Sequence, residues 1–328
     1  MKEVISLMIR IGVVGCSEIA YRRFMPAVAE IDSVKVEAVA EEYAPEKLEA
    51  FCNNFGIEGM TSFDDLISRE DIDAIYVPQP PALHYKWAKK SLESGKHVLI
   101  EKPSTISYRD SKELIDIAKS NNLAFHENYM FQYHRQIKEI KDIISKGIIG
   151  DIRLFRADFG FPLREKNDFR YIRNLGGGAL FDAGGYTIKL ATLFLGDTIR
   201  LLSAHSSSID GYEVDMYGSL MFSNKDNMVF QTSYGMDNSY RCSLNIWGNK
   251  GEISTSRILT APPDLEPEFV IRTANDTKTI KGKKDNSFRH SIENFAYEIE
   301  HRDARMDMYR QILLQARLVD EVKNELKI

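Results

Sequence analysis

Three side chains of this 328-residue sequence have the types and spacing to handle a proton and a developing negative charge. Lys102 lies between Glu101 and Pro103 at the end of an apolar run. Asp182 and Tyr186 follow a glycine run and are four positions apart, so on a helix they would share one face. Reduction of a ketone needs a hydride from one side and a proton for the forming alkoxide.

The chemistry suggests a role for each of the three. A phenol titrates at about 10 in water, and a nearby ammonium favours the phenolate and lowers that value. We predict that Tyr186 donates the proton and that Lys102 polarises the carbonyl and tunes Tyr186. Asp182 would orient the substrate through a hydroxyl group. The alternatives are a half-buried core tyrosine and a solvated lysine.

A second pattern follows the apolar run at 9–14, where the sequence from Gly15 reads G-x-S-x-x-A. The pattern is close to the G-x-G-x-x-G/A turn that holds a dinucleotide pyrophosphate. Gly15 would make the tight turn, Ser17 could bond phosphate, and Ala20 would let the helix pack closely. The alternative is an ordinary turn between a strand and a helix. The predicted cofactor contacts here are Gly15, Cys16, Ser17, Glu18 and Ile19.

The end of the next apolar run, at 34–40, carries Glu41 and Glu42. A carboxylate at this point accepts a hydrogen bond from the ribose 2′-hydroxyl and repels a 2′-phosphate. No arginine stands where NADP selectivity would need one, so we expect NAD(H) to be favoured, with NADP(H) possible. The alternative is a pair of exposed loop acids.

These residues depend on the elements around them. Through residue 126, short apolar runs alternate with helical stretches, which predicts an α/β fold with a doubly wound parallel sheet. After about residue 130, the runs alternate apolar and polar residues, as in an antiparallel sheet with one covered face. A helix at 179–195 interrupts these strands, a hairpin turn is expected at 224–227, and 273–286 reads as a surface loop.

The three motifs together resemble those of the Gfo/Idh/MocA oxidoreductases: Gly15-x-Ser17-x-x-Ala20, Glu101-Lys102-Pro103, and the string at 176–186, GGGALFDAGGY. The resemblance implies a Rossmann domain at 1–125 and an α+β domain with an open, mostly antiparallel sheet at 126–328. It also implies bound NAD(H) or NADP(H) and interconversion of alcohol and carbonyl groups on sugars or related polyols.

Many family members carry histidine where this chain has Tyr186, so the chain resembles the tyrosine branch. That branch includes glucose–fructose oxidoreductase, dihydrodiol and xylose dehydrogenases, and 3-ketoreductases of nucleotide-linked deoxysugars. Strings at 168–171, 234–236, 247–248 and 260–263 favour the last group.

The resemblance adds further site residues, for which ordinary scaffold is the alternative reading. Those expected near the cofactor are Gln79, Pro80, His84, Glu101, Lys102 and Asn128. Those expected to contact substrate are Lys102, Asp182, Tyr186, Arg170 and His134.

Composition narrows the class of partner. With 43 Lys and Arg against 48 Asp and Glu, the net charge is −5, which argues against nucleic acid. No apolar run approaches the roughly 18 residues of a membrane span. Three widely spaced cysteines argue against disulfides and fit a cytoplasmic protein, and the histidines suggest no metal site. An exposed sheet face would favour a homodimer or homotetramer through the second domain.

We therefore expect a nicotinamide-dependent oxidoreductase whose partner is a small-molecule sugar or nucleotide-sugar. The favoured reaction is reduction of a nucleotide-linked 3-keto-6-deoxysugar. One alternative is a dehydrogenase that oxidises a free sugar or a dihydrodiol. Another is a non-catalytic NAD-binding regulator.

Overall fold

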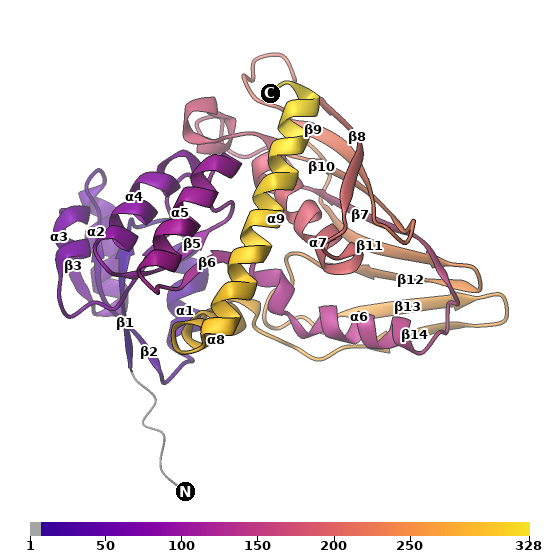
Figure 1. The fold of residues 1–328 in the computed structure, drawn as a ribbon, viewed down its shortest axis with the longest axis horizontal. Helices are drawn as coiled ribbons and strands as arrows, with labels where there is room; N and C mark the ends of the chain where they lie inside the picture. Colours follow the sequence, from indigo (N-terminus) through magenta and orange to yellow (C-terminus); the bar gives the residue numbers. More distant parts are fainter. Residues whose placement is uncertain (1–7) are drawn as a thin grey trace, which may run out of the picture. The chain divides into compact units, whose positions relative to one another are not determined.

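A computed structural model describes residues 8–328. By their internal contacts these residues form two compact units, which Figure 1 shows in ribbon form. Unit 1 takes the chain up to Asn128 and again from Phe288 to Leu313, and unit 2 takes 129–287 and 314–328. The return of 288–313 to unit 1 was not expected from the sequence. The bounds 1–125 and 126–328 concern folding domains and remain a proposal.

The sheet of unit 1 has parallel strands in the order β3-β2-β1-β4-β5-β6. These strands are β1 (Ile9–Val14), β2 (Val34–Ala40), β3 (Glu58–Met60), β4 (Ala74–Val77), β5 (His97–Glu101) and β6 (Phe125–Asn128). Every residue of β4 is buried, as expected for a strand covered on both faces. The predicted doubly wound parallel sheet is confirmed.

Helices connect these strands, and α4 packs beside α5 (Figure 1). The connecting helices are α2 (Pro45–Phe55), α3 (Phe63–Ser68), α4 (Pro81–Glu93) and α5 (Tyr108–Ser120). The helix after β1 begins as a π-helix, η1 (Ala20–Phe24), and continues as α1 (Met25–Val28). Near the C-terminus, α8 (Ser287–Glu300) belongs almost entirely to unit 1, and α9 (Arg302–Leu326) is divided between the units.

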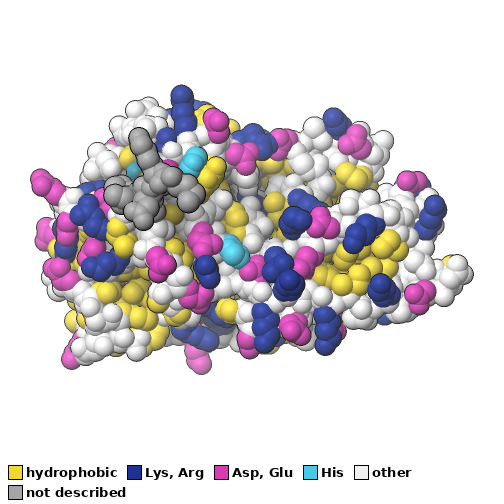
Figure 2. Space-filling view, turned by 90° about the horizontal axis from the view of Figure 1, so that it is seen from below, with side chains coloured by type: hydrophobic (Ala, Val, Ile, Leu, Met, Phe, Trp, Pro, Cys, Tyr) yellow, Lys and Arg dark blue, Asp and Glu magenta, His cyan; other side chains and the backbone are white. Residues whose placement is uncertain are grey.

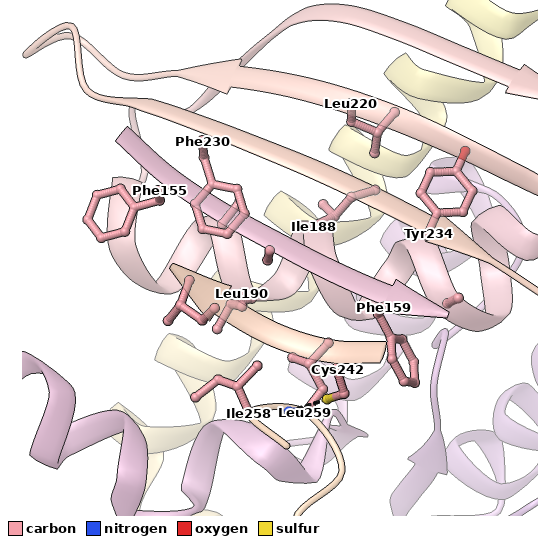
Figure 3. Close-up of a cluster of buried hydrophobic side chains, with 14 of the residues drawn as sticks. Phe155, Phe159, Ile188, Leu190, Leu220, Phe230, Tyr234, Cys242, Ile258 and Leu259 are labelled. Carbon is pink, nitrogen blue, oxygen red and sulfur yellow. Dashed lines mark hydrogen bonds between the residues drawn. The ribbon is translucent and has the colours of Figure 1, made fainter. Parts of the chain in front are cut away.

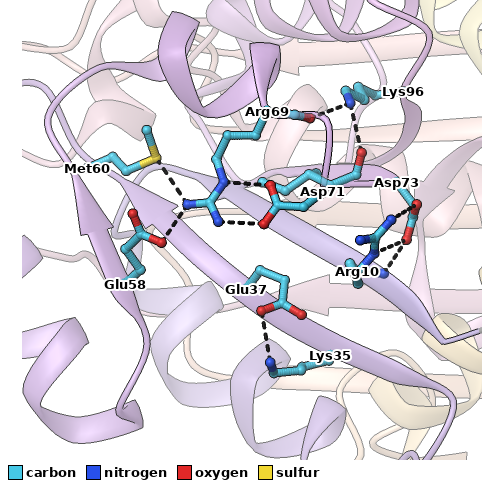
Figure 4. A network of polar contacts seen from close by, with 10 residues as sticks. Arg10, Lys35, Glu37, Glu58, Met60, Arg69, Asp71, Asp73 and Lys96 are labelled. Atoms are coloured by element: carbon cyan, nitrogen blue, oxygen red, sulfur yellow. Dashed lines mark hydrogen bonds and ion pairs between the residues drawn. The ribbon is translucent and has the colours of Figure 1, made fainter.

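A group of ion pairs lies around the amino ends of strands in unit 1 (Figure 4). Asp73 accepts hydrogen bonds from the Arg10 backbone N–H at 2.8 Å and from its guanidinium at 3.0 and 2.9 Å. Burial would raise the pKa of the Asp73 carboxyl, but the bonds from Arg10 outweigh burial and lower it. Arg69 donates in the same way to Asp71 and Glu58. The residues of the predicted cofactor site lie at the opposite, carboxyl ends of the strands.

The sheet of unit 2 is mixed and mostly antiparallel, in the order β14-β13-β12-β11-β7-β10-β9-β8. Only the β10–β7 pair is parallel among these neighbours. The strands are β7 (Ile152–Gly160), β8 (Arg200–Ser207), β9 (Tyr217–Ser223), β10 (Val229–Gly235), β11 (Arg241–Gly248), β12 (Gly251–Ser256), β13 (Glu268–Thr273) and β14 (Thr277–Lys281). The predicted class of the second sheet is confirmed.

One face of this sheet packs on helices α6 (Arg135–Ser145) and α7 (Gly185–Leu195), as Figure 1 shows. Figure 3 shows Ile188 and Leu190 of α7 beside Phe155 and Phe230 of the sheet, all of them buried. Residues of β11 alternate between exposed and buried, which is the pattern of a sheet with one covered face.

Two local expectations had different outcomes. The turn predicted at 224–227 is confirmed: it joins β9 to β10, and Asn227 has a φ of 58°. The surface loop predicted at 273–286 is wrong in part, because 277–281 form the edge strand β14, which pairs with β13. The strand was missed because its residues are largely polar and exposed, as is common for an edge strand.

On the face shown in Figure 2, basic and acidic side chains are intermixed. Among residues 8–328, no helix combines the length and apolar character needed to cross a bilayer.

Candidate active site

The turn after β1 depends on the absence of a side chain at Gly15. Gly15 has a φ of +108° and donates its N–H to the carbonyl of Ala40 at 2.9 Å. A Cβ at this position would lie 2.1 Å from Nε2 of Gln79, which donates to the carbonyl of Val14 at 2.8 Å. Both the left-handed conformation and this close approach require glycine. The structure thus brings Gly15 and Gln79 together, as the predicted site needs.

The helix that follows this turn begins at Glu18. Ser17 accepts the N–H of Ala20 through Oγ at 3.2 Å, while Glu18 and Ile19 lie in the first helical turn. First-turn N–H groups have no intrahelical acceptor and favour anions. The donor set therefore fits a pyrophosphate. Cys16 is buried, and burial and the nearby Glu41 raise the pKa of its thiol to about 12, so it is an inert side chain.

The carboxylate of Glu41 accepts hydrogen bonds from two backbone N–H groups, one in the turn after β1 and one in its own loop. Its Oε2 accepts the N–H of Cys16 at 2.9 Å and its Oε1 accepts the N–H of Tyr43 at 3.0 Å. Glu42 accepts the N–H of Phe63 at 2.9 Å. Glu41 is half-buried and its carboxylate has two backbone partners, so the alternative of an exposed loop acid describes Glu42 better than Glu41. Its contact with a ribose remains a prediction.

The end of β5 carries the acid and the ammonium of the E-K-P motif. Glu101 is buried, and its Oε1 accepts the hydroxyl of Tyr76 at 2.8 Å and Nδ2 of Asn128 at 2.6 Å. Burial raises the pKa of Glu101, and these bonds together with the charge of Lys102 act against that rise. Lys102 is half-buried, and its peptide bond to Pro103 is cis.

His84 ties two loops of the site together. Its ring is fully buried, with Nδ1 2.7 Å from the carbonyl oxygen of Pro103 and Nε2 2.6 Å from that of Gln79. Two carbonyl acceptors favour a doubly protonated ring, but burial is the larger effect and lowers the pKa to about 4. At neutral pH the ring therefore donates one hydrogen bond. Pro80 caps α4 beside it, and direct cofactor contacts for both residues remain predictions.

In unit 2, the segment with Asp182 and Tyr186 is not a uniform α-helix. Asp182 lies in the π-helix η5 (Leu180–Gly184), and Tyr186 lies in the α-helix α7 that continues it. The helix expected at 179–195 is therefore present, with a π-helical first part. Because a π-turn contains more residues than an α-turn, positions four apart still lie near one face.

Asp215 anchors the start of this segment. Its Oδ2 accepts the N–H of Leu180 at 2.8 Å, and its backbone oxygen accepts the N–H of Ala179 at 2.8 Å. A Cβ on Gly178, which has a φ of +124°, would lie 2.4 Å from Oδ1 of Asp215. The glycine run therefore admits a carboxylate, which sequence reasoning missed because Asp215 is far away in the chain and belongs to no recognisable motif.

The ring of Tyr186 is held by aromatic neighbours within unit 2. Its centroid lies 5.4 Å from that of Tyr129, 5.9 Å from Phe131 and 5.4 Å from Phe159. Its hydroxyl is 3.9 Å from Sδ of Met130, and a thioether is a weak acceptor. Tyr186 is half-buried, as the core alternative requires, and its hydroxyl lies beside a thioether.

Arg170 joins two carboxylates. Its Nε donates to Asp182 at 2.7 Å, and its Nη1 donates to Asp168 at 3.0 and 3.2 Å. Burial lowers the pKa of the guanidinium, but the two carboxylates outweigh it and raise the pKa. The structure therefore brings Arg170 and Asp182 together, and one oxygen of Asp182 is already occupied. Substrate contact by either remains a prediction.

His134 lies elsewhere in unit 2, at the start of α6. It is buried, and its Nδ1 accepts the N–H of Gln136 at 3.2 Å, which caps the helix. A capping role is therefore observed for His134, and its substrate contact remains a prediction.

The strand order, the glycine turn and the helix N-terminus define unit 1 as a dinucleotide-binding Rossmann unit. Residues 9–129 match the model of an oxidoreductase family with an NAD-binding Rossmann fold, and 137–254 match the GFO/IDH/MocA C-terminal domain. The chain belongs to the Gfo/Idh/MocA family of oxidoreductases, as its motifs predicted.

Several relatives resemble the chain along most of its length. It is 36% identical over 291 residues to a dTDP-3,4-didehydro-2,6-dideoxy-alpha-D-glucose 3-reductase of Saccharopolyspora spinosa, covering 89% of this chain and 87% of the relative. It is 24% identical to an NADP(+)-dependent D-xylose 1-dehydrogenase of Haloferax volcanii, covering 88% of each.

Among solved structures, the chain resembles KijD10, a 3-ketoreductase from Actinomadura kijaniata in complex with NADP and TDP-benzene. The TM-score is 0.92 at 33% identity, and the match covers 97% of this chain and 98% of KijD10. Because KijD10 is complexed with NADP, the expected preference for NAD(H) has no support from this relative.

The anchor of the Tyr186 helix predicts a specific pH dependence of stability. Burial raises the pKa of Asp215 to about 6, against 3.8 for the free side chain. The Asp215 carboxyl therefore binds its proton more tightly in the folded state than in the unfolded state. The protonated carboxyl stabilises the fold fully below pH 4, and this stabilisation is lost as pH rises through 6. The loss is at most about 3 kcal/mol, since each pKa unit is worth about 1.4 kcal/mol.

Asp215→Asn cannot titrate, so between pH 4 and pH 7 it should gain up to about 3 kcal/mol of stability relative to the wild type. Urea unfolding at the two pH values measures this difference, and Asp226→Asn in an exposed turn is the control. The same pH dependence in Asp215→Asn and wild type would contradict the prediction.

Proposed function

We propose that this protein reduces the 3-keto group of a dTDP-linked 3-keto-6-deoxysugar, using a reduced nicotinamide dinucleotide. The observation that carries the proposal is its likeness, along nearly the whole chain, to a 3-reductase at 36% identity and a 3-ketoreductase at 33% identity. The glycine turn, the half-buried Lys102 and the phenol of Tyr186 supply the groups that such a reaction needs.

Each residue has a distinct part in the proposed reaction. When bound, the cofactor supplies the hydride. Tyr186 donates the proton to the forming alkoxide, and its ring is kept in one orientation by the surrounding aromatic side chains. Lys102 places a positive charge at the carbonyl oxygen. Arg170 fixes the carboxylate of Asp182, which orients a sugar hydroxyl.

Substitution of the two central residues tests this assignment. Tyr186→Phe should lower kcat about 100-fold because it removes the proton donor, and Lys102→Met should have an effect of similar size. If both groups act on one oxygen, the double variant will lose less than the product of the two single effects. The measurement is oxidation of the reduced cofactor with a dTDP-linked 3-ketosugar. Near wild-type turnover in both single variants would refute the roles.

The principal alternative is a dehydrogenase that oxidises a free sugar, and the likeness to a xylose dehydrogenase favours it. Assays in both directions, with xylose, glucose and a dihydrodiol beside the dTDP-ketosugar, separate the two reactions. A non-catalytic regulator would bind cofactor and turn over none of these compounds.

For the cofactor, we propose that the ordered carboxylate of Glu41 favours NAD(H) over NADP(H), although a relative is complexed with NADP. Glu41→Gln removes the charge that would repel a 2′-phosphate and should lower the KM for NADPH about tenfold, with little change for NADH. Glu42→Gln is the matched control. A wild-type protein that already prefers NADPH would contradict the proposal.

We also propose a homodimer or homotetramer formed through the sheet of unit 2. Leu202, Tyr217 and Trp247 on this sheet are 47%, 43% and 61% exposed, and apolar exposure of this kind favours association. Trp247→Glu should reduce the mass measured by light scattering to that of a smaller species, whereas Tyr43→Glu in unit 1 should not. A monomeric wild type would contradict the proposal. A cytoplasmic location also remains a prediction.

A further inference from the structure

Helix α8 presents a buried polar stripe to strand β6 within unit 1. Ser291 and Glu298 are seven positions apart on α8 and so lie on one face of the helix. Both side chains are buried, at 0% and 1% exposed. They meet His126 and Asn128, which are themselves 0% and 2% exposed. Polar groups at such depth are retained only when they are hydrogen-bonded.

The stripe forms a continuous chain of hydrogen bonds that ends at the catalytic motif. The carboxylate of Glu298 lies 3.0 and 3.1 Å from Nδ1 of His126, and Nε2 of that ring lies 3.0 Å from Oγ of Ser291. Ser291 donates to Oδ1 of Asn128 at 2.8 Å. Asn128 then donates to Oε1 of Glu101 at 2.6 Å, next to Lys102.

The direction of these bonds is determined by how many hydrogens each group has. Asn128 uses its amide N–H on Glu101, so its oxygen must accept from Ser291. A serine hydroxyl has one hydrogen, so Ser291 must accept from Nε2 of His126. Nδ1 of that ring then needs a hydrogen between it and the Glu298 carboxylate. Glu298 therefore supplies the partner of Nδ1 that keeps the ring oriented with Nε2 toward Ser291.

We propose that Ser291 and Glu298, contributed by the C-terminal segment, are positioning residues for the ketone reduction. They fix the amide of Asn128 so that its N–H, and not its oxygen, faces Glu101. Glu101 is thereby held as an acceptor at the end of β5, and the backbone that carries Lys102 is fixed with it. The inference deepens the proposed function and rests on it.

Ser291→Ala tests the chain against a matched control. Ser91 is also 0% exposed, but its hydroxyl bonds only to the carbonyl of Trp87 within its own helix. Ser291→Ala should lower kcat about tenfold with unchanged KM for the sugar, because one buried bond to the network is lost. Ser91→Ala should keep wild-type kcat, and Ser291→Thr, which retains the hydroxyl, should restore most of it. Equal kcat in Ser291→Ala and Ser91→Ala would overturn the inference.

Two substitutions of Glu298 test the chain. In Glu298→Gln the amide N–H can donate to Nδ1 of His126, so Nε2 still donates to Ser291 and Ser291 to Asn128, and kcat should stay near the wild-type value. Glu298→Leu removes the polar partner of Nδ1 and should match Ser291→Ala in kcat, and the double variant Ser291→Ala/Glu298→Leu should be no slower than either single variant. A tenfold loss of kcat in Glu298→Gln, or additive losses in the double variant, would contradict a single chain.

A second readout works without turnover. In protein labelled with ¹⁵N-asparagine, the side-chain amide signals of Asn128, assigned through Asn128→Asp, should shift in Ser291→Ala and Glu298→Leu but not in Ser91→Ala. If the wild type reduces no ketosugar, the proposed function fails, and this shift still decides the inference. Unmoved Asn128 signals would overturn it.

Discussion

Parallel pairing of the strands in unit 1 is the constraint on which the candidate site depends. In such a sheet all carboxyl ends lie along one edge, and ligands bind beyond that edge. The Gly15 turn, Glu41, Gln79, the Glu101–Lys102 pair and Asn128 all follow or end a strand there. The amino ends carry the Arg10–Asp73 pair instead, so stability and chemistry are separated between the two ends.

Within this edge, loops are joined by bonds between residues far apart in sequence. Gln79 reaches Val14, Glu41 reaches Cys16, and His84 links Gln79 to Pro103. Unit 2 has similar contacts. Arg170 donates to Asp182, and Asp215 accepts a hydrogen bond at the start of the helix that carries Tyr186. The loops and helix starts of the candidate site are thus held by polar partners, several of which are themselves partly or fully buried.

Much of this arrangement could be predicted from local sequence. Short, mostly apolar segments identified β1, β2, β4 and β5, and three short motifs located Gly15, Lys102 and Tyr186. Strand β3 was missed because Glu58-Gly-Met60 has neither an apolar run nor alternation. The π-helical start at Leu180 was missed because it differs from an α-helix in hydrogen-bond register and not in composition.

The long-range partners were beyond sequence reasoning. Asp215 meets Leu180 across 35 positions, and Ser291 meets Asn128 across 163. No periodicity relates such residues, since only the fold brings them together. The net charge of −5 was also uninformative about the candidate site, because a sum over the chain does not show where a single charge such as that of Lys102 lies.

Single-turnover transfer from a reduced cofactor deuterated at its hydride position tests the central claim most directly. Mixed with a dTDP-linked 3-keto-6-deoxysugar, the protein should oxidise the cofactor stoichiometrically and place the deuterium on carbon 3 of the product sugar. A product without deuterium, or cofactor that stays reduced while an independent assay shows it bound, would contradict the proposed reduction.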